Sequence, residues 1–131
     1  MKYLPPFEAL KPYYTMSNVK GELRVSCTYE NLVQMLRMLI IGVEVDEEWY
    51  LGRYPDIAGA IDEGTIQSAR LHFVNDGYFE GRVPFPIHAN ERYYLSQNAD
   101  VSELVRKGEL KSGQQHFEGN GYSEGRLPFG M

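Results

Sequence analysis

Residues 47–85 read EEWYLGRYPDIAGAIDEGTIQSARLHFVNDGYFEGRVPF, and residues 91–129 read ERYYLSQNADVSELVRKGELKSGQQHFEGNGYSEGRLPF. The second stretch repeats the first at an offset of 44 residues without a gap, which indicates a duplication. Identical pairs include Tyr50/Tyr94, Asp56/Asp100, Gly64/Gly108, Ser68/Ser112, His72/His116, Gly77/Gly121, Tyr78/Tyr122, Glu80/Glu124 and Arg82/Arg126. We expect a mainly α fold of two tandem 44-residue helical repeats, packed on each other and preceded by a short β-strand and helix.

Three short helical pieces are predicted in each copy. Asp46 is a suitable N-cap for the first piece. The second begins at Pro55, a favoured first helical residue, and in the second copy it follows Asn98 as its cap. Gly64 and Gly108 supply a left-handed residue at which this piece ends.

The third predicted piece covers residues 66–76 and again residues 110–120. Ile66, Ala69 and Phe73 are spaced at i, i+3 and i+7, so they share one helix face. The small residue in the middle of that face lets another helix approach closely. We therefore expect the two copies, residues 46–89 and 90–131, to pack about a pseudo-twofold axis.

The first 45 residues have a different character. Three prolines fall in residues 1–18, which predicts an extended arm without regular periodicity. Polar and apolar residues alternate over residues 20–29, which predicts a strand that pairs with the arm or with another subunit. A short amphipathic helix ending at Gly42 follows. Residues 1–45 are thus a candidate oligomer or partner interface.

Composition narrows the classes of function. The net charge is −5, and because residues 1–45 carry +1, residues 46–131 carry −6. An acidic repeat region disfavours nucleic-acid binding. Cys27 is the only cysteine, so a thiol-rich metal site is excluded and no base lies near it in sequence. The sequence predicts no secretory signal and no membrane span, and a cytoplasmic location is the expectation.

Segments of the first copy also carry a family resemblance. Residues 49–61 (WYLGRYPDIAGAI) and 68–84 (SARLHFVNDGYFEGRVP) contain aromatic-Tyr-Leu, Tyr-Pro-Asp, His-aromatic and Glu-Gly-Arg elements. This pattern resembles a short repeat that occurs beside bacterial surface-polysaccharide glycosyltransferases and in some calcium-binding exoproteins. The resemblance covers residues 46–131, and the second copy departs from it at residues 97–100 (QNAD). It implies an association with glycan machinery and no catalytic role of its own.

The two repeated histidines are the main candidates for chemistry. His72 and His116 each follow a serine by four residues, so each pair shares a helix face. A serine hydrolase also needs a strained nucleophile turn and an oxyanion hole, and neither has a signature here. A set of two nitrogen and two oxygen ligands from His72, His116, Glu80 and Glu124 is the metal hypothesis. The simplest interpretation places each histidine in a hydrogen bond with the backbone of its own closing turn.

The tails GYFEGRVPF and GYSEGRLPF favour a structural role. Gly77 and Gly81 permit unusual backbone angles, and Arg82 is placed to fold back onto Glu80 or onto carbonyls at the helix end. The alternative is a groove for sugar rings or for a partner's aromatic residue. The candidate binding residues are Trp49, Tyr50, Tyr78, Arg82, Tyr93, Tyr94, Tyr122 and Arg126.

Three hypotheses of function follow. The favoured one is a non-catalytic accessory or protein-interaction module, linked to bacterial surface-polysaccharide machinery, that uses no cofactor and binds a protein partner or a further copy of itself through residues 1–45. The alternative is a carbohydrate-binding module that uses the aromatic residues. The third is a small metal-dependent enzyme centred on His72 and His116.

Overall fold

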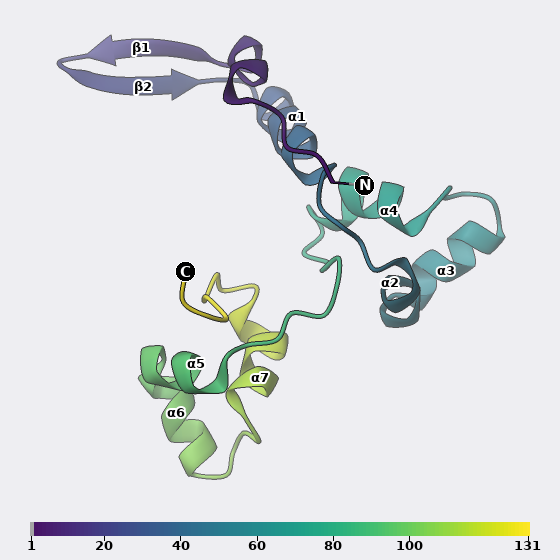
Figure 1. Ribbon diagram of the computed structural model, residues 1–131, viewed down its shortest axis with the longest axis vertical. Helices are drawn as coiled ribbons and strands as arrows, with labels where there is room; N and C mark the ends of the chain where they lie inside the picture. Colours follow the sequence, from purple (N-terminus) through teal and green to yellow (C-terminus); the bar gives the residue numbers. More distant parts are fainter. Residues whose placement is uncertain (1) are drawn as a thin grey trace. The chain divides into compact units, whose positions relative to one another are not determined.

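The computed structural model describes residues 2–131, and the fold is mainly α-helical. Contacts divide the chain into a first unit that ends at Phe85 and a second unit, Pro86–Met131. Each unit has helices of its own (Figure 1). Each also has a buried core of its own. The first unit holds residues 2–45 together with the helices of the first copy.

The chain begins with an arm that leads into a β-hairpin (Figure 1). Two 3-10 turns, Phe7–Ala9 and Lys11–Tyr13, precede β1, Thr15–Val19. β1 pairs antiparallel with β2, Glu22–Ser26. Lys20 and Gly21 join the strands with φ of 52° and 84°, the combination found in tight hairpin turns that match the strand twist.

This hairpin corrects part of the prediction for residues 1–45. The strand was expected to start at residue 20, but Lys20 and Gly21 form the turn and β2 begins at Glu22. Its partner is the end of the predicted extended arm. All ten strand residues are exposed. The hairpin therefore adds no side chain to the core of its unit.

Helix α1, Tyr29–Ile40, follows the hairpin. Thr28 caps it by accepting a hydrogen bond from the N–H of Asn31 at 3.0 Å. Arg37 fixes the helix to the first copy, since its Nη2 donates to the carbonyl of Asn75 at 2.8 Å. Ile40 is the only core residue that α1 supplies.

The first copy contains α2, Glu47–Arg53, then α3, Pro55–Asp62, and α4, Ala69–His72. Asp46 caps α2, and Gly64 with φ of 80° follows α3, so both predicted signals are confirmed. The third helix is shorter than predicted, because Ser68 caps it and leaves Ile66 outside. A π-helical turn, Phe73–Gly77, continues it.

The second copy has the corresponding elements. They are α5, Glu91–Gln97, α6, Ala99–Arg106, α7, Gly113–His116, and a π-helical turn, Phe117–Gly121. Asn98 occupies the predicted cap position of α6, but its side chain makes no cap hydrogen bond. Tyr94, Val101 and Phe117 form the buried core of this unit.

The core of the first copy is built from equivalent positions. Tyr50, Ile57, Ala69, Phe73 and Val74 are buried there, together with the end of α1. Tyr50 and Tyr94 are both fully buried, and each lies close to the phenylalanine that opens its π-helical turn. Within residues 2–131, no helix combines the length and apolar character that a bilayer crossing requires.

Candidate functional site

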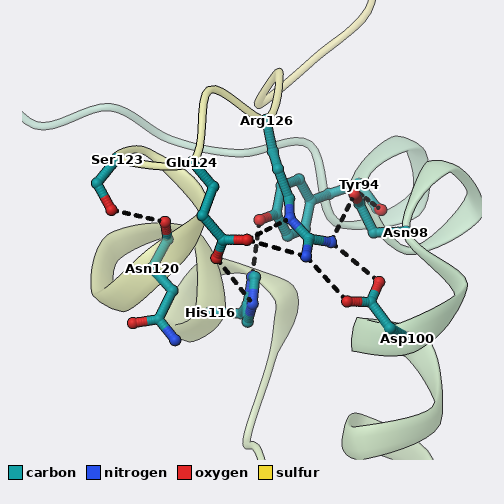
Figure 2. Close-up of polar contacts among 8 residues, drawn as sticks. All are labelled: Tyr94, Asn98, Asp100, His116, Asn120, Ser123, Glu124 and Arg126. Carbon is teal, nitrogen blue, oxygen red and sulfur yellow. Dashed lines mark hydrogen bonds and ion pairs between the residues drawn. The ribbon is translucent and has the colours of Figure 1, made fainter.

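A polar network of five side chains ties the helices of each copy to its closing turn. In the first copy it contains Tyr50, Asp56, His72, Glu80 and Arg82. In the second copy it contains Tyr94, Asp100, His116, Glu124 and Arg126 (Figure 2). We call each set the closing network.

The histidine of the first copy is buried between two partners. The Tyr50 hydroxyl lies 2.9 Å from His72 Nδ1, and His72 Nε2 lies 3.2 Å from Glu80 Oε1. A carboxylate accepts but does not donate, so Glu80 favours the tautomer with hydrogen on Nε2. Nδ1 is then free to accept a hydrogen bond from the Tyr50 hydroxyl. Both ring nitrogens therefore have protein partners.

Arg82 links the closing turn to α3. Its Nη1 and Nη2 donate to the two carboxylate oxygens of Asp56 at 3.0 and 2.8 Å, a bidentate pair that fixes the angle of the guanidinium. Its Nε lies 3.5 Å from Glu80 Oε1, and its guanidinium lies over the ring of Tyr54. Arg82 was expected to fold back onto Glu80 or onto carbonyls at the helix end. It does lie near Glu80, but its closer contacts are with Asp56.

The second copy repeats this arrangement with one shift (Figure 2). The Tyr94 hydroxyl lies 2.8 Å from His116 Nδ1, and Arg126 bonds both oxygens of Asp100 at 2.9 Å. Glu124 leans toward Arg126, at 3.1 Å, and lies 4.0 Å from His116 Nε2.

Asn98 stands in the second copy where the first has Tyr54. Its Oδ1 accepts from Arg126 Nη1 at 2.9 Å, and its Nδ2 donates to the carbonyl of Tyr94 at 2.8 Å. An amide thus replaces an aromatic ring as the second support of the arginine. The missing Tyr-Pro of the second copy leaves the closing network intact.

Ionisation equilibria reflect these contacts. The hydrogen bond from Arg126 lowers the pKa of Asp100 to about 2, and the bond from Arg82 lowers the pKa of Asp56. Burial raises the pKa of the Tyr50 hydroxyl to about 12 and raises that of Tyr94. The network therefore holds neutral tyrosines beside ionised aspartates over the neutral pH range.

Gly77 and Gly121 make room for the buried hydroxyls. A Cβ atom on either glycine would overlap the hydroxyl oxygen of Tyr50 or Tyr94. Gly81 and Gly125, in contrast, have φ of 83° and 78°, the left-handed region that favours glycine. The prediction that Gly77 is needed for its backbone angle is thus corrected, because close approach is the reason.

Residues outside the predicted site also hold the helices of each copy together. Glu91 accepts from the N–H groups of Gly113 and Gln114 at 3.0 and 2.7 Å, and Glu47 accepts from that of Arg70 at 3.0 Å. Gln114 Nε2 bonds the carbonyl of Ile87, as Arg70 bonds that of Val43, which precedes Ile87 by 44 residues. An arginine in the first copy and a glutamine in the second therefore make the same contact with the segment that precedes their copy.

The serines beside the histidines are helix caps. Ser68 Oγ accepts from the N–H of Leu71 at 3.1 Å, and Ser112 Oγ accepts from that of Gln115 at 3.1 Å. The partner of each histidine is a tyrosine and a glutamate, which also corrects the expected bond to the backbone of the closing turn. The structure gives the Ser–His hydrolase interpretation no support.

The metal hypothesis draws two residues from each copy. Within one copy, His72 Nε2 lies 3.2 Å from Glu80 Oε1, and His116 Nε2 lies 4.0 Å from Glu124 Oε1. In the stretch from residue 2 to residue 131, no group of three or more His, Cys, Asp or Glu side chains is arranged to hold a metal ion. The four-ligand set across both copies stays a prediction.

The eight candidate binding residues have different environments. Tyr50 and Tyr94 are fully buried, so neither ring offers a face to a ligand, contrary to expectation. Arg82 and Arg126 are held in ion pairs. Tyr78 is 39% exposed, and the remaining three, Trp49, Tyr93 and Tyr122, are half-buried. A groove lined by the remaining residues stays a prediction.

Comparison with known proteins adds no relative. No family model matches the chain, and no curated protein and no solved structure does so. The resemblance to the repeat found beside glycosyltransferases stays a prediction.

Proposed function

We propose that this chain is a non-catalytic interaction module whose two repeats form a scaffold and whose residues 1–45 bind a protein partner or a further copy of the chain. The observation that carries the proposal is the distribution of exposed apolar side chains. Of the large apolar side chains exposed in residues 2–131, eleven lie before residue 42 and seven after it. Exposed apolar surface concentrated in one segment is typical of an interface.

The hairpin gives the clearest part of this surface. Met16 faces Val25 across the strands and Asn18 faces Leu23, so these four side chains share one face. Met16, Leu23 and Val25 are 56%, 67% and 60% exposed. We call these three residues the apolar hairpin face. Apolar side chains gathered on one face of a strand are typical of a face that is buried against another surface.

The polar groups of the repeats support the same proposal. Each side chain of the closing network bonds or pairs with others of its own copy. Both ring nitrogens of His72 have a close partner, and Nδ1 of His116 bonds the Tyr94 hydroxyl. A catalytic base must reach a substrate proton, and a buried, fully partnered histidine is poorly placed for that. The residues shared by the two copies thus stabilise the scaffold. Because of the sequence resemblance, polysaccharide glycosyltransferases are the first candidates for the protein partner.

The test is a native mass spectrum of the tagged chain purified from its own host. We expect a stoichiometric companion protein or a second copy, and we expect its loss when Leu23 and Val25 are both replaced by Ser. Leu127→Ser is the matched control, because Leu127 is an exposed apolar residue of the second unit at 47%. Circular dichroism checks that both variants remain folded.

Two results would overturn the proposal. One is a chain that carries neither a companion protein nor a second copy. The other is a companion that the Leu23→Ser, Val25→Ser chain retains at the same stoichiometry as the control. A stably bound glycan or metal mass on a lone chain would instead support one of the alternative functions.

A further inference from the structure

The two edges of the hairpin differ in charge. β2 carries Glu22 and Arg24, whereas β1, Thr15–Val19, carries no charged residue and no proline. Natural proteins commonly protect an exposed edge strand with charges, prolines or bulges. The outer edge of β1 therefore lacks these protections, although all of its residues are exposed.

The register shows which backbone groups point outward from β1. Val19 and Glu22 close the two-residue turn and exchange hydrogen bonds, and bonded and non-bonded pairs then alternate along the ladder. Thr15, Ser17 and Val19 thus direct their N–H and C=O groups toward β2. Met16 and Asn18 direct theirs away from β2, where no second strand within residues 2–131 pairs with them.

We infer that β1 pairs with β1 of a second copy, antiparallel, about a twofold axis through Ser17. In this register Met16 of one chain lies opposite Asn18 of the other. The outward N–H and C=O groups of both residues then meet their counterparts, which gives four interchain hydrogen bonds. The inference rests on the proposed function, since it specifies the occupant of the interface in residues 1–45.

The charges on the two strands favour self-pairing through β1 over self-pairing through β2. The same symmetric pairing through β2, centred on Arg24, would place Arg24 against Arg24 of the other chain, and like charges directly opposed destabilise a sheet. Pairing through β1 opposes Thr15 with Val19 and Ser17 with Ser17, so no charges meet. A twofold, self-complementary contact is the commonest way in which soluble chains assemble.

The pairing also accounts for a hairpin whose strand residues are all exposed. An isolated two-stranded hairpin is marginal in water, and three or more strands with an apolar face are more stable. The dimer forms a four-stranded sheet in the order β2, β1, β1, β2. The twofold axis lies perpendicular to the sheet, so the apolar hairpin faces of both chains join on one side.

The experiment uses single cysteines on a Cys27→Ser chain in oxidised glutathione. Opposed residues of a non-bonded antiparallel pair have Cβ atoms about 4.5–5.5 Å apart, close enough for a disulfide to form with small adjustments. Ser17→Cys is therefore expected to give a covalent dimer on a non-reducing gel. Arg24→Cys is the matched control, because Arg24 faces Ser17 across the hairpin but lies on the other edge. Its chain is expected to run as a monomer on the same gel, since the paired β1 strands keep the two β2 strands apart.

A second pair of variants tests the hydrogen bonds. Met16 and Val25 are cross-strand partners of similar exposure, and both turn their N–H groups outward, on opposite edges. Met16→Pro removes a donor from the β1 edge and is expected to halve the mass found by light scattering. Val25→Pro removes one from the β2 edge and is expected to leave a dimer.

Either of two results would overturn the inference. In the first, the unsubstituted chain is monomeric at micromolar concentration and the Ser17→Cys chain forms no covalent dimer. The other is a dimer that Val25→Pro breaks and Met16→Pro spares. The proposed function fails separately, when material from the host carries no companion and no second copy that depends on Leu23 and Val25.

Discussion

The two copies hold the same five network side chains in slightly different balance. In the first copy the glutamate lies nearer to the histidine, with His72 Nε2 at 3.2 Å from Glu80 Oε1 and Arg82 Nε at 3.5 Å. In the second copy it lies nearer to the arginine, with 3.1 Å to Arg126 Nη2 and 4.0 Å to His116 Nε2. The invariant parts are the Tyr–His bond and the bidentate Arg–Asp pair.

The comparison distinguishes contacts that identical residues make in both copies from contacts that different residues make at equivalent positions. Tyr54 and Asn98 occupy equivalent positions with unrelated side chains, and both support the arginine. Arg70 and Gln114 likewise bond the backbone of the preceding segment by different chemistry. Identity between the copies follows the buried or bidentate contacts, where another residue type would leave a polar group unpaired.

The largest expected effect comes from the glycines that face the buried hydroxyls. Gly77→Ala and Gly121→Ala each place a methyl group against a tyrosine hydroxyl, and overpacking of this kind costs about 1–3 kcal/mol, to which the loss of the Tyr–His bond adds. Urea unfolding of each variant measures the free energy of unfolding. Gly119→Ala is the control, since its Cβ meets no atom within 4 Å. Equal stability of Gly119→Ala and Gly121→Ala would contradict the close approach.

The next effect comes from the hydroxyls themselves. Tyr50→Phe and Tyr94→Phe each leave a buried imidazole nitrogen without a partner, which costs roughly 1–3 kcal/mol of unfolding free energy. The two costs are expected to agree, because the Tyr–His distances are 2.9 and 2.8 Å. A cost confined to one copy would show that the networks are not equivalent.

The pH dependence of stability above pH 9 tests the role of the Tyr50 hydroxyl further. Burial raises the pKa of Tyr50 to about 12, so its contribution to stability is complete below the ordinary tyrosine pKa and is lost as pH rises toward 12. Unfolding free energy measured from pH 9 upward is therefore expected to fall less steeply in Tyr50→Phe than in the unsubstituted chain. Parallel pH dependences would contradict this assignment.

The smallest effect is expected at the exposed end of the network. Arg126 lowers the pKa of Asp100 to about 2, so the pair contributes above the ordinary aspartate pKa and is lost as pH falls through about 2. Asp100→Asn is expected to flatten the acid limb of the stability profile slightly, since the carboxylate is 59% exposed. A carboxyl titration by NMR with an unshifted pKa would contradict the bidentate pair.

Local signals were predicted better than tertiary ones. Asp46 and Gly64 act within a few residues, so their roles could be identified from the sequence. Asp56 was visible as an identity between the copies, but its partner Arg82 lies 26 residues away and only the fold brings them together. Tyr50 was assigned to a binding surface because a tyrosine suits both a core and a surface.

The N-terminal segment shows the same limit. The irregular alternation in Thr15–Val19 concealed β1, although Lys20-Gly21 is a turn signal of the kind that joins hairpin strands. Comparison of the two copies could not help there, because the hairpin, residues 15–26, has no counterpart in the second copy.

The tautomers of the two histidines test the closing network most directly, and long-range nitrogen–proton NMR spectra of the full chain can measure them. We expect His72 and His116 to share one pattern in the neutral form, with hydrogen on Nε2 and a hydrogen-bonded, unprotonated Nδ1. Hydrogen on Nδ1 in either residue, or rings that exchange freely with solvent, would contradict a closing network common to both copies.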